Sequence, residues 1–120
     1  MIKSYKDHEV HQKSYELAME IFWLTRNIPK EEIYSLTSQV ARSSRSVSAN
    51  IAEGWAKGEY ESSFKNHLIH SLGSSAETEN WLMFARDCKY LTDDQFEQLK
   101  IKNESIGKML ARLHQNRKSY

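Results

Sequence analysis

Hydrophobic residues recur along the chain at alternating three- and four-residue steps, and this pattern predicts amphipathic helices. The first helix covers about residues 10–27, because Pro29 blocks its continuation. Its apolar face consists of Val10, Leu17, Ile21, Leu24 and Ile28. The second helix covers about residues 36–57, with Ser35 as its expected N-cap and Gly58 just after its end. Its apolar face consists of Leu36, Val40, Val47, Ile51 and Trp55.

Two further helices follow the same pattern. The third covers about residues 59–89, and its predicted apolar face consists of Tyr60, Phe64, Leu68, Leu72, Ala76, Leu82 and Met83. The fourth covers about residues 93–116 and begins after Thr92, which forms a capping-box pattern with Gln95. Its apolar face consists of Phe96, Leu99, Ile106, Leu110 and Leu113. Four amphipathic helices with short links predict one all-α domain over residues 1–120, an antiparallel up-down-up-down four-helix bundle.

The composition narrows the class of protein without suggesting a chemistry. Hydrophobic residues make up 39% and charged residues 28%, as in ordinary globular domains. The formal net charge of +1 lacks the basic excess of a dedicated nucleic-acid binder. Cys88 is the single cysteine, and neither a signal peptide nor a membrane span is evident. We therefore expect a cytoplasmic protein without disulfides.

The stretch "SANIAEGWAKG" continues a narrow polar stripe along the second helix. Arg42, Ser46, Asn50, Glu53 and Lys57 follow one another at steps of three or four residues, opposite Val47. An ordinary solvated face explains such a stripe. A face that packs against another helix or another subunit also explains it, and we expect the second arrangement.

The third helix carries a run of small residues, "SLGSSAE", with Gly73 in its middle. A helical glycine costs about 1 kcal/mol relative to alanine, so close approach of another helix is the expected reason; merely exposed serines are the alternative. Gly73, Ser74, Glu77, Trp81 and Phe84 fall together and suggest a second contact face, hence self-association. The predicted interface residues, of helices or of subunits, are Arg42, Ser46, Asn50, Glu53, Gly54, Gly73, Ser74, Glu77 and Trp81.

Two blocks carry a resemblance to a known family. "LTSQVARSSRSVSANIAEGWAKG" and "FKNHLIHSLGSSAETE" resemble the bacterial four-helix-bundle family known from intervening sequences in 23S ribosomal RNA genes, often labelled ribosomal-protein-like. The likeness runs from about Tyr15 to Leu113, and its most specific parts are Asn50 to Gly54 and Gly73 to Glu77. It implies a ring-like homopentamer, and a relative is the basic accessory protein of diversity-generating retroelements, which is associated with a reverse transcriptase and nucleic acid. No catalytic residues come with the family.

The remaining candidate chemistry is weak. His8 with His11, and His67 with His70, are spaced to share a metal on a helix, but no surrounding carboxylate set completes a site. We expect no metal, no cofactor and no enzymatic activity. Arg112, Arg117 and Lys118 form a small basic cluster that a ring of copies would multiply into a larger patch. A solvated tail is the plainer interpretation of this cluster.

The sequence therefore favours a non-enzymatic, homo-oligomeric helical adaptor associated with RNA, ribosomes or a nucleic-acid enzyme. The alternative is a module that binds RNA or DNA directly through Arg112, Arg117 and Lys118. The tryptophans Trp23, Trp55 and Trp81 lie within helical patterns, and we expect them to be core or interface anchors rather than platforms for stacking bases.

Overall fold

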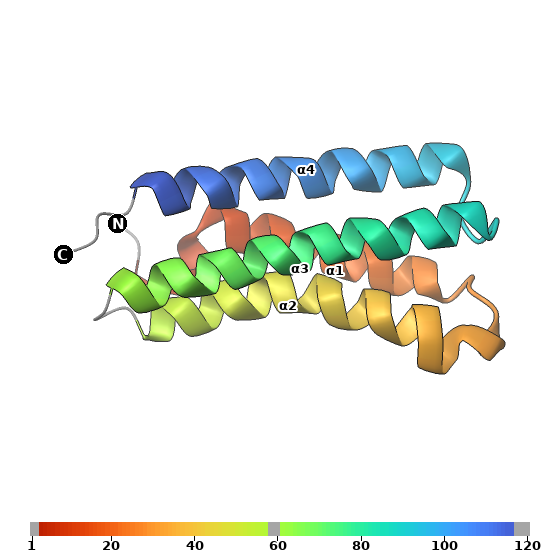
Figure 1. Cartoon of the computed structure of the whole chain (residues 1–120), viewed down its shortest axis with the longest axis horizontal. Coiled ribbons are helices and arrows are strands. Elements are labelled where there is room, and N and C mark those ends of the chain that lie inside the picture. Colours follow the sequence, from red (N-terminus) through yellow and green to blue (C-terminus); the bar gives the residue numbers. More distant parts are fainter. Residues whose placement is uncertain (1–2, 58–60, 117–120) are drawn as a thin grey trace.

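Four long helices form the molecule. The computed structural model describes residues 3–57 and 61–116, and its helices are α1 (Glu9–Thr25), α2 (Ser38–Ala56), α3 (Glu61–Asp87) and α4 (Asp93–Asn116). They lie side by side and alternate in direction along the 47 Å long axis (Figure 1). The predicted all-α four-helix bundle is confirmed, and the described residues contain no strand. No helix in this part of the chain has both the length and the apolar character needed to cross a bilayer.

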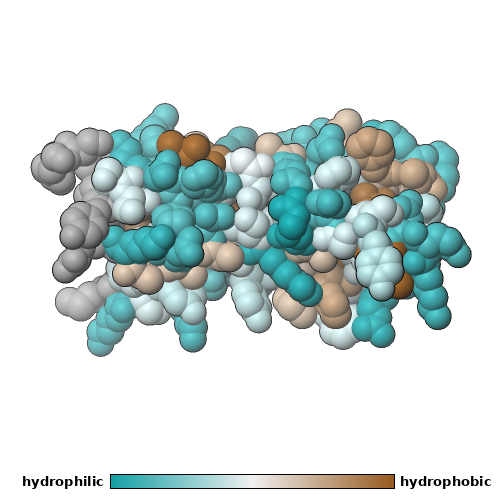
Figure 2. Space-filling model, turned by 60° about the horizontal axis from the view of Figure 1, so that its bottom comes forward, coloured by the Kyte–Doolittle hydropathy of each residue, from teal (hydrophilic) through white to brown (hydrophobic). Residues whose placement is uncertain are grey.

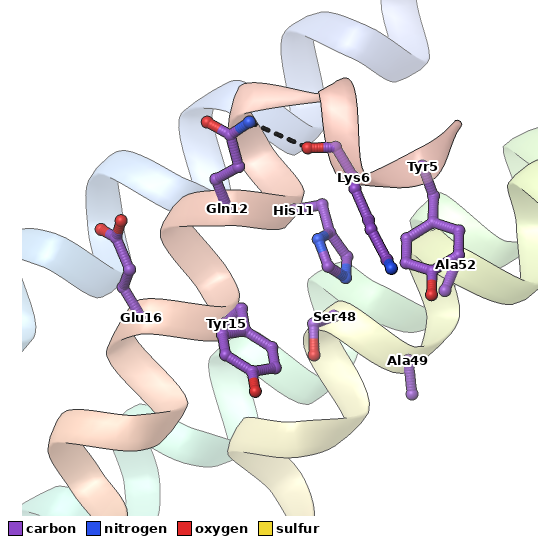
Figure 3. A pocket seen from close by; sticks show the side chains of 9 residues that line it. All are labelled: Tyr5, Lys6, His11, Gln12, Tyr15, Glu16, Ser48, Ala49 and Ala52. Carbon is purple, nitrogen blue, oxygen red and sulfur yellow. Dashed lines mark hydrogen bonds between the residues drawn. The ribbon is translucent and has the colours of Figure 1, made fainter. Parts of the chain in front are cut away.

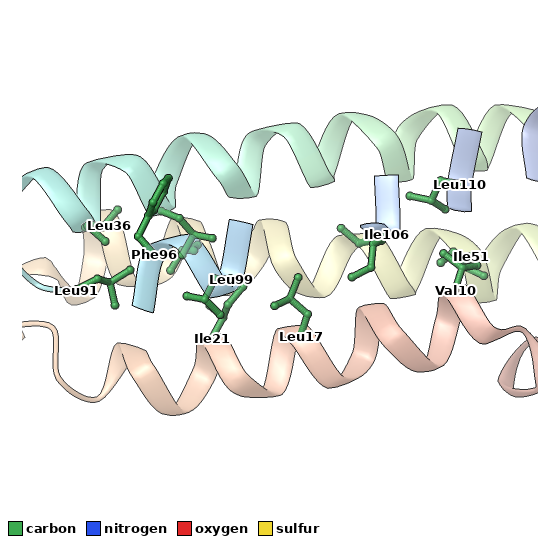
Figure 4. Close-up of a cluster of buried hydrophobic side chains, with 14 of the residues drawn as sticks. Val10, Leu17, Ile21, Leu36, Ile51, Leu91, Phe96, Leu99, Ile106 and Leu110 are labelled. Atoms are coloured by element: carbon green, nitrogen blue, oxygen red, sulfur yellow. The ribbon is translucent and has the colours of Figure 1, made fainter. Parts of the chain in front are cut away.

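Each helix packs against the next one in sequence, α1 also meets α4, and the most extensive contact joins α2 to α3. Their inward faces form one central core along the bundle (Figure 4). Its fully buried members include Ile21, Val40, Ile51, Phe64, Leu68 and Leu110. Burial of one such side chain stabilises the fold by about 1.5–3 kcal/mol relative to leaving it in water.

The inward face of α3 differs from the predicted one. The structure buries Phe64, Leu68, Ser71, Ser75, Thr78, Leu82 and Ala85, which follow strict four- and three-residue steps. Ala76 and Met83, expected in the core, are exposed, and Leu72 is half-buried. The prediction was wrong here because it followed apolar side chains, whereas the heptad positions in the middle of α3 carry hydroxyl groups.

Hydroxyl groups fit in the core because each finds a partner across the helix contact. The hydroxyl of Ser71 donates to the carbonyl oxygen of Val47 over 2.7 Å. Thr78 donates to the hydroxyl of Ser43 over 2.9 Å. Ser71, Thr78 and Ser43 are all 0% exposed, and such small side chains let the two backbones approach closely. A buried hydroxyl without a partner would cost about 1–3 kcal/mol.

A further buried polar pair joins α3 to α4. The side-chain amide of Asn103 donates to the carbonyl oxygen of Ser75 over 2.8 Å, and the Ser75 hydroxyl donates to the Asn103 side-chain oxygen over 3.1 Å. Asn103 occupies a heptad position between Leu99 and Ile106, where the other buried residues of α4 are apolar.

Gly54 lies at a close contact between α2 and α3. A Cβ atom added at Gly54 would lie 2.9 Å from the Cβ atom of His67, closer than side chains pack. At Gly73 an added Cβ atom would meet nothing within 4 Å. The expectation that Gly73 permits close helix approach is therefore wrong within the single chain, and Gly54 has that role.

The connection between α1 and α2 is helical rather than extended. A 3₁₀ turn (Lys30–Glu32) and a π-helical turn (Ile33–Thr37) lead directly into α2. Ser35 is therefore not the N-cap; its hydroxyl donates to the carboxylate of Glu32. Tyr90 donates to the same carboxylate over 3.0 Å, which ties the connection to the end of α3. The bonds from Ser35 and then Tyr90 lower the pKa of Glu32.

The connection between α3 and α4 also follows local rules. Lys89 adopts a left-handed conformation with φ of 69°, which ends α3 two residues before the predicted boundary. The backbone N–H of Tyr90 then donates to the carbonyl oxygen of Ala85 over 2.8 Å. The predicted capping box is confirmed, because Gln95 N–H donates to the Thr92 hydroxyl oxygen and Thr92 N–H donates to the Gln95 side chain. The predictions for Gly58 and Tyr60 lie outside the described residues.

We expect Gly54→Ala to lower the free energy of unfolding by about 1 kcal/mol. Overpacking costs about 1–3 kcal/mol, because the Cβ atom of His67 is held by the backbone, and it outweighs the gain in helix propensity. Gly107→Ala is the matched control, because an added Cβ atom there meets nothing within 4 Å. This control should gain up to about 1 kcal/mol. Equal stabilities of the two variants in urea unfolding would contradict the close contact.

Candidate interaction surfaces

The polar stripe predicted on the second helix lies on the side of α2 that meets α3. Arg42 donates to the carboxylate of Glu77 and, over 2.9 Å, to the side-chain oxygen of Gln39. The indole N–H of Trp81 donates to the same Glu77 oxygen over 2.9 Å. The side chain of Arg42 is 55% exposed, so this ion pair contributes only about 0–1 kcal/mol. Its main effect is to fix how the side chains of the two helices meet.

The stripe continues towards the end of α2 as a row of hydrogen bonds. Ser46 and Ser74 share a bond of 2.8 Å between their hydroxyl oxygens. The amide of Asn50 donates to the Ser46 carbonyl oxygen over 2.9 Å. The side-chain oxygen of Asn50 then lies 3.1 Å from Nδ1 of His67, which donates to it. The bonds from Ser46 to Ser74 and from His67 to Asn50 join α2 to α3, and the bond from Asn50 to Ser46 lies within α2.

His67 is the central residue of this row, and the sequence prediction missed it. Its Nδ1 atom lies 3.4 Å from a carboxylate oxygen of Glu53, and its Nε2 atom lies 3.5 Å from Nζ of Lys57. The sequence analysis names His67 only together with His70, as a possible metal-binding pair. It precedes Ser74 by seven residues, so the same heptad spacing extended backwards would have found it.

The structure divides the predicted interface residues into two groups. Those at the contact between α2 and α3 within one chain are Arg42, Ser46, Asn50, Glu53, Gly54, Ser74, Glu77 and Trp81. Gly73 and Phe84, which the sequence grouped with Trp81, instead lie on the exposed side of α3.

Part of the exposed side of α3 is apolar. Ile69, Met83 and Phe84 are 52%, 41% and 53% exposed, and they flank the exposed Gly73 and Ala76. At 100° per residue these five residues point away from the core positions of α3. We call them the outer face of α3. A row of large exposed apolar side chains on one helix face is typical of a contact surface.

A groove between α1 and α2 forms a second apolar surface, with a cavity volume of about 500 Å³. Figure 3 shows the rings of Tyr5, His11 and Tyr15 turned towards α2, which presents Ser48, Ala49 and Ala52. Lys6, Gln12 and Glu16 complete the lining of this α1–α2 groove. Tyr5 belongs to a 3₁₀ turn (Tyr5–Asp7) before α1. The ring centroid of Tyr5 lies 4.8 Å from that of His11, so the two rings on this side of the groove pack against each other.

Apolar side chains continue from the groove along α1. Tyr15, Met19 and Trp23 are 57%, 39% and 59% exposed at four-residue steps. Trp23 is thus not a core residue; the guanidinium of Arg26 lies 5.6 Å from its ring centroid. Figure 2, which turns the lower side of Figure 1 forward, shows pale and light brown side chains interrupting the hydrophilic ones on this side.

The predicted nucleic-acid contacts are largely outside the described structure. The side chain of Arg112 is exposed near the end of α4, and Arg117 and Lys118 lie outside the described residues. Direct binding of RNA or DNA through these three residues stays a prediction. In the described part of the chain, no three His, Cys, Asp or Glu side chains come together as metal ligands.

The groove gives folding stability a defined pH dependence. Burial, and then the positive charge of Lys6, lower the pKa of His11 below its ordinary 6.5. The other ionisable lining groups are Tyr5, Tyr15 and Glu16, and α2 contributes only uncharged side chains. The unfolded chain therefore binds the proton more tightly than the folded chain, so stability falls as the pH drops through about 6.5.

We expect the melting temperature of the wild type to decrease between about pH 7.5 and pH 5.5 by more than that of His11→Gln, because the variant lacks this titration. His70→Gln, which changes an exposed histidine outside the groove, should keep the wild-type pH dependence. An identical pH profile for the wild type and His11→Gln in calorimetry would contradict the assignment.

Comparison with known proteins agrees with the fold and the resemblance. Residues 6–112 match the family model described as 23S rRNA-intervening sequence protein. A crystal structure of a protein of unknown function from the S23 ribosomal protein family, from Bacteroides thetaiotaomicron VPI-5482, is 30% identical, with a TM-score of 0.81. The match covers 89% of this chain and 96% of that one. Among curated proteins, no match is found. The family match spans most of the bundle and includes both motif blocks, so the chain belongs to the 23S rRNA-intervening sequence protein family.

Proposed function

We propose that the protein is a self-associating helical-bundle adaptor without enzymatic activity, and that its partner is RNA, a ribosome or a nucleic-acid enzyme. The outer face of α3 is the observation that carries self-association. Its five residues, Ile69, Gly73, Ala76, Met83 and Phe84, carry no charge, and neither do Leu72 and Asn80 beside them. Depletion of charge around exposed apolar side chains distinguishes the centre of protein interfaces from ordinary surface.

Gly73 strengthens this inference. It lies within a 27-residue helix, where glycine costs about 1 kcal/mol relative to alanine. Among the described residues, no atom lies within 4 Å of the position that its Cβ atom would take, so packing within this part of the chain does not account for the cost. Close approach of another copy does account for it, because a glycine lets two backbones come together. The ring-like homopentamer implied by the family resemblance would use such a contact.

Two further observations support an adaptor associated with RNA machinery. The side chains best suited to acid–base chemistry, among them His67, Glu53 and Glu77, are bonded to partners across the contact between α2 and α3. They hold the two helices against each other. The family model is named for intervening sequences of 23S rRNA, and the structural relative is assigned to an S23 ribosomal protein family. These family names support an association with ribosomal RNA or ribosomes, and the outer face of α3 supports self-association.

We expect the wild type to elute as an oligomer, with five copies as the proposed number, and Gly73→Leu to be a monomer of the same helicity. Leucine is a good helix former, so the variant should fold, but its side chain would separate the two copies. Size-exclusion chromatography with light scattering gives the mass, and circular dichroism gives the helix content. Gly107→Leu places the same change on α4 and should assemble like the wild type. A monomeric wild type at micromolar concentration would overturn the proposal.

A further inference from the structure

Aromatic side chains gather along the exposed side of the contact between α1 and α2. His11, Tyr15 and Phe22 follow one another at four- and seven-residue steps, so they lie on one side of α1. The rings of His11 and Tyr15 are turned towards α2 (Figure 3), and Arg45 of α2 lies over the ring of Phe22. Trp23 packs edge to face against Phe22 and is still 59% exposed. We call the α1–α2 groove together with Phe22, Trp23, Arg26 and Arg45 the aromatic strip.

The two arginines of the strip have no anionic partner in the fold. The guanidinium of Arg26 lies 5.6 Å from the centroid of the Trp23 ring, and that of Arg45 lies 5.7 Å from the centroid of the Phe22 ring. Both arginines are exposed, and neither forms an ion pair with a carboxylate of residues 3–57 or 61–116. Each therefore keeps its planar set of N–H donors for an anion from outside, and this geometry matches a phosphate or a carboxylate.

The carboxylates of α1 and α2 lie on other sides of these helices. Glu53 carries the single carboxylate of α2 and lies 3.4 Å from His67 of α3. Glu20 of α1 binds Lys102 of α4 over 2.7 Å. Glu16 lies at the edge of the groove one turn before Glu20, and Figure 3 shows it directed away from the rings. Negative charge on the two helices is thus turned towards α3 and α4.

Positive charge remains on the strip. Lys6 lines the groove, with its Nζ atom 5.9 Å from the centroid of the Tyr5 ring, and Figure 3 shows its side chain extending towards α2. Arg26 and Arg45 supply positive charge beyond the other end of the groove. A chain with a formal net charge of only +1 therefore concentrates cations and exposed rings on one surface. A partner that fits this surface is anionic and presents flat groups that can stack.

We propose that the aromatic strip binds a single-stranded nucleic acid, with bases stacked on the exposed rings of Trp23 and Tyr15 and phosphates on Arg26 and Arg45. A single strand has both required properties, because its bases are free to stack on side chains, whereas duplex bases stack on one another. The inference rests on the RNA partner proposed above and names the surface that meets it, without depending on self-association. Trp23, expected from the sequence to be an anchor, becomes a stacking platform because the fold leaves it exposed.

The first test uses labelled single strands of about 12 nucleotides, RNA and DNA of one mixed sequence, and measures their fluorescence anisotropy with the full chain. We expect the wild type to bind at least one of the two strands, and to bind the corresponding duplex at least about tenfold more weakly. Tighter binding of RNA than of DNA would identify RNA as the partner. Poly-glutamate should not displace the strand at an equal concentration of negative charge, because it has no rings to stack.

Two matched variants test the stacking. Trp23→Leu and Phe84→Leu each replace a ring that is about half exposed on a helix by leucine, a good helix former. Trp23→Leu should weaken binding of the single strand by about 5- to 150-fold, the loss of one stacked base. Phe84→Leu, on the outer face of α3, should bind like the wild type. Circular dichroism checks that both variants fold.

Three further variants test the phosphate contacts. Arg26→Gln and Arg45→Gln should each lower the slope of log Kd against the logarithm of the salt concentration by about 0.7, the contribution of one phosphate of a single strand. Arg112→Gln, an exposed arginine of α4, should keep the wild-type slope. Loss of binding in Arg112→Gln with unchanged binding in the other two variants would place the contact on α4 and overturn the aromatic strip.

The remaining outcomes separate this inference from the proposed function. An oligomeric wild type, by light scattering of the same samples, that binds neither RNA nor DNA at low salt would overturn the strip and leave a self-associating adaptor for another partner. A duplex bound as tightly as the single strand, full displacement by poly-glutamate, or unchanged binding by Trp23→Leu would overturn the stacking. A monomeric wild type whose binding falls as expected in Trp23→Leu would support the strip and overturn self-association.

Discussion

The close approach of α2 to α3 is the constraint on which the rest of the structure depends. Ser43 and Thr78 bond to each other in a fully buried position, and Gly54 lies against His67 without room for another atom. Small side chains bring the two backbones together, and their hydroxyl groups must then find partners across the contact. With this pair fixed, α1 and α4 bury largely apolar faces against it, and the polar row from Arg42 to Lys57 follows along its edge.

Much of the fold could be predicted from the sequence because helices depend on local periodicity and capping. The fourth helix begins where the Thr92 capping box predicts, because both bonds of that motif form within four residues. The face of α3 could not be predicted in the same way. Ser71, Ser75 and Thr78 are buried by partners on α2 and α4, and no local pattern reveals those partners.

For the candidate surfaces too, the sequence predicts features within one helix but not those that depend on a second helix. Arg42, Ser46 and Asn50 could be placed on one face of α2 from their spacing alone, but the spacing did not say what that face meets. Gly73 was noticed because glycine is unfavourable in a helix, whereas Gly54, at the actual close contact, was noticed only as part of a motif. The groove was not predicted, because a concave surface forms between two helices and the spacing along one helix does not reveal it.

The buried pair of Asn103 and Ser75 has a consequence for how the bundle chooses its alignment. The neighbouring core residues of α4 are apolar, and such residues tolerate sliding along a partner helix by one turn. A slip of one turn would separate the Asn103 side chain from the carbonyl oxygen and the hydroxyl of Ser75, at a cost of about 1–3 kcal/mol for each group left unsatisfied. The pair therefore favours one register of α4 on α3 over its neighbours, a contribution to uniqueness rather than to overall stability.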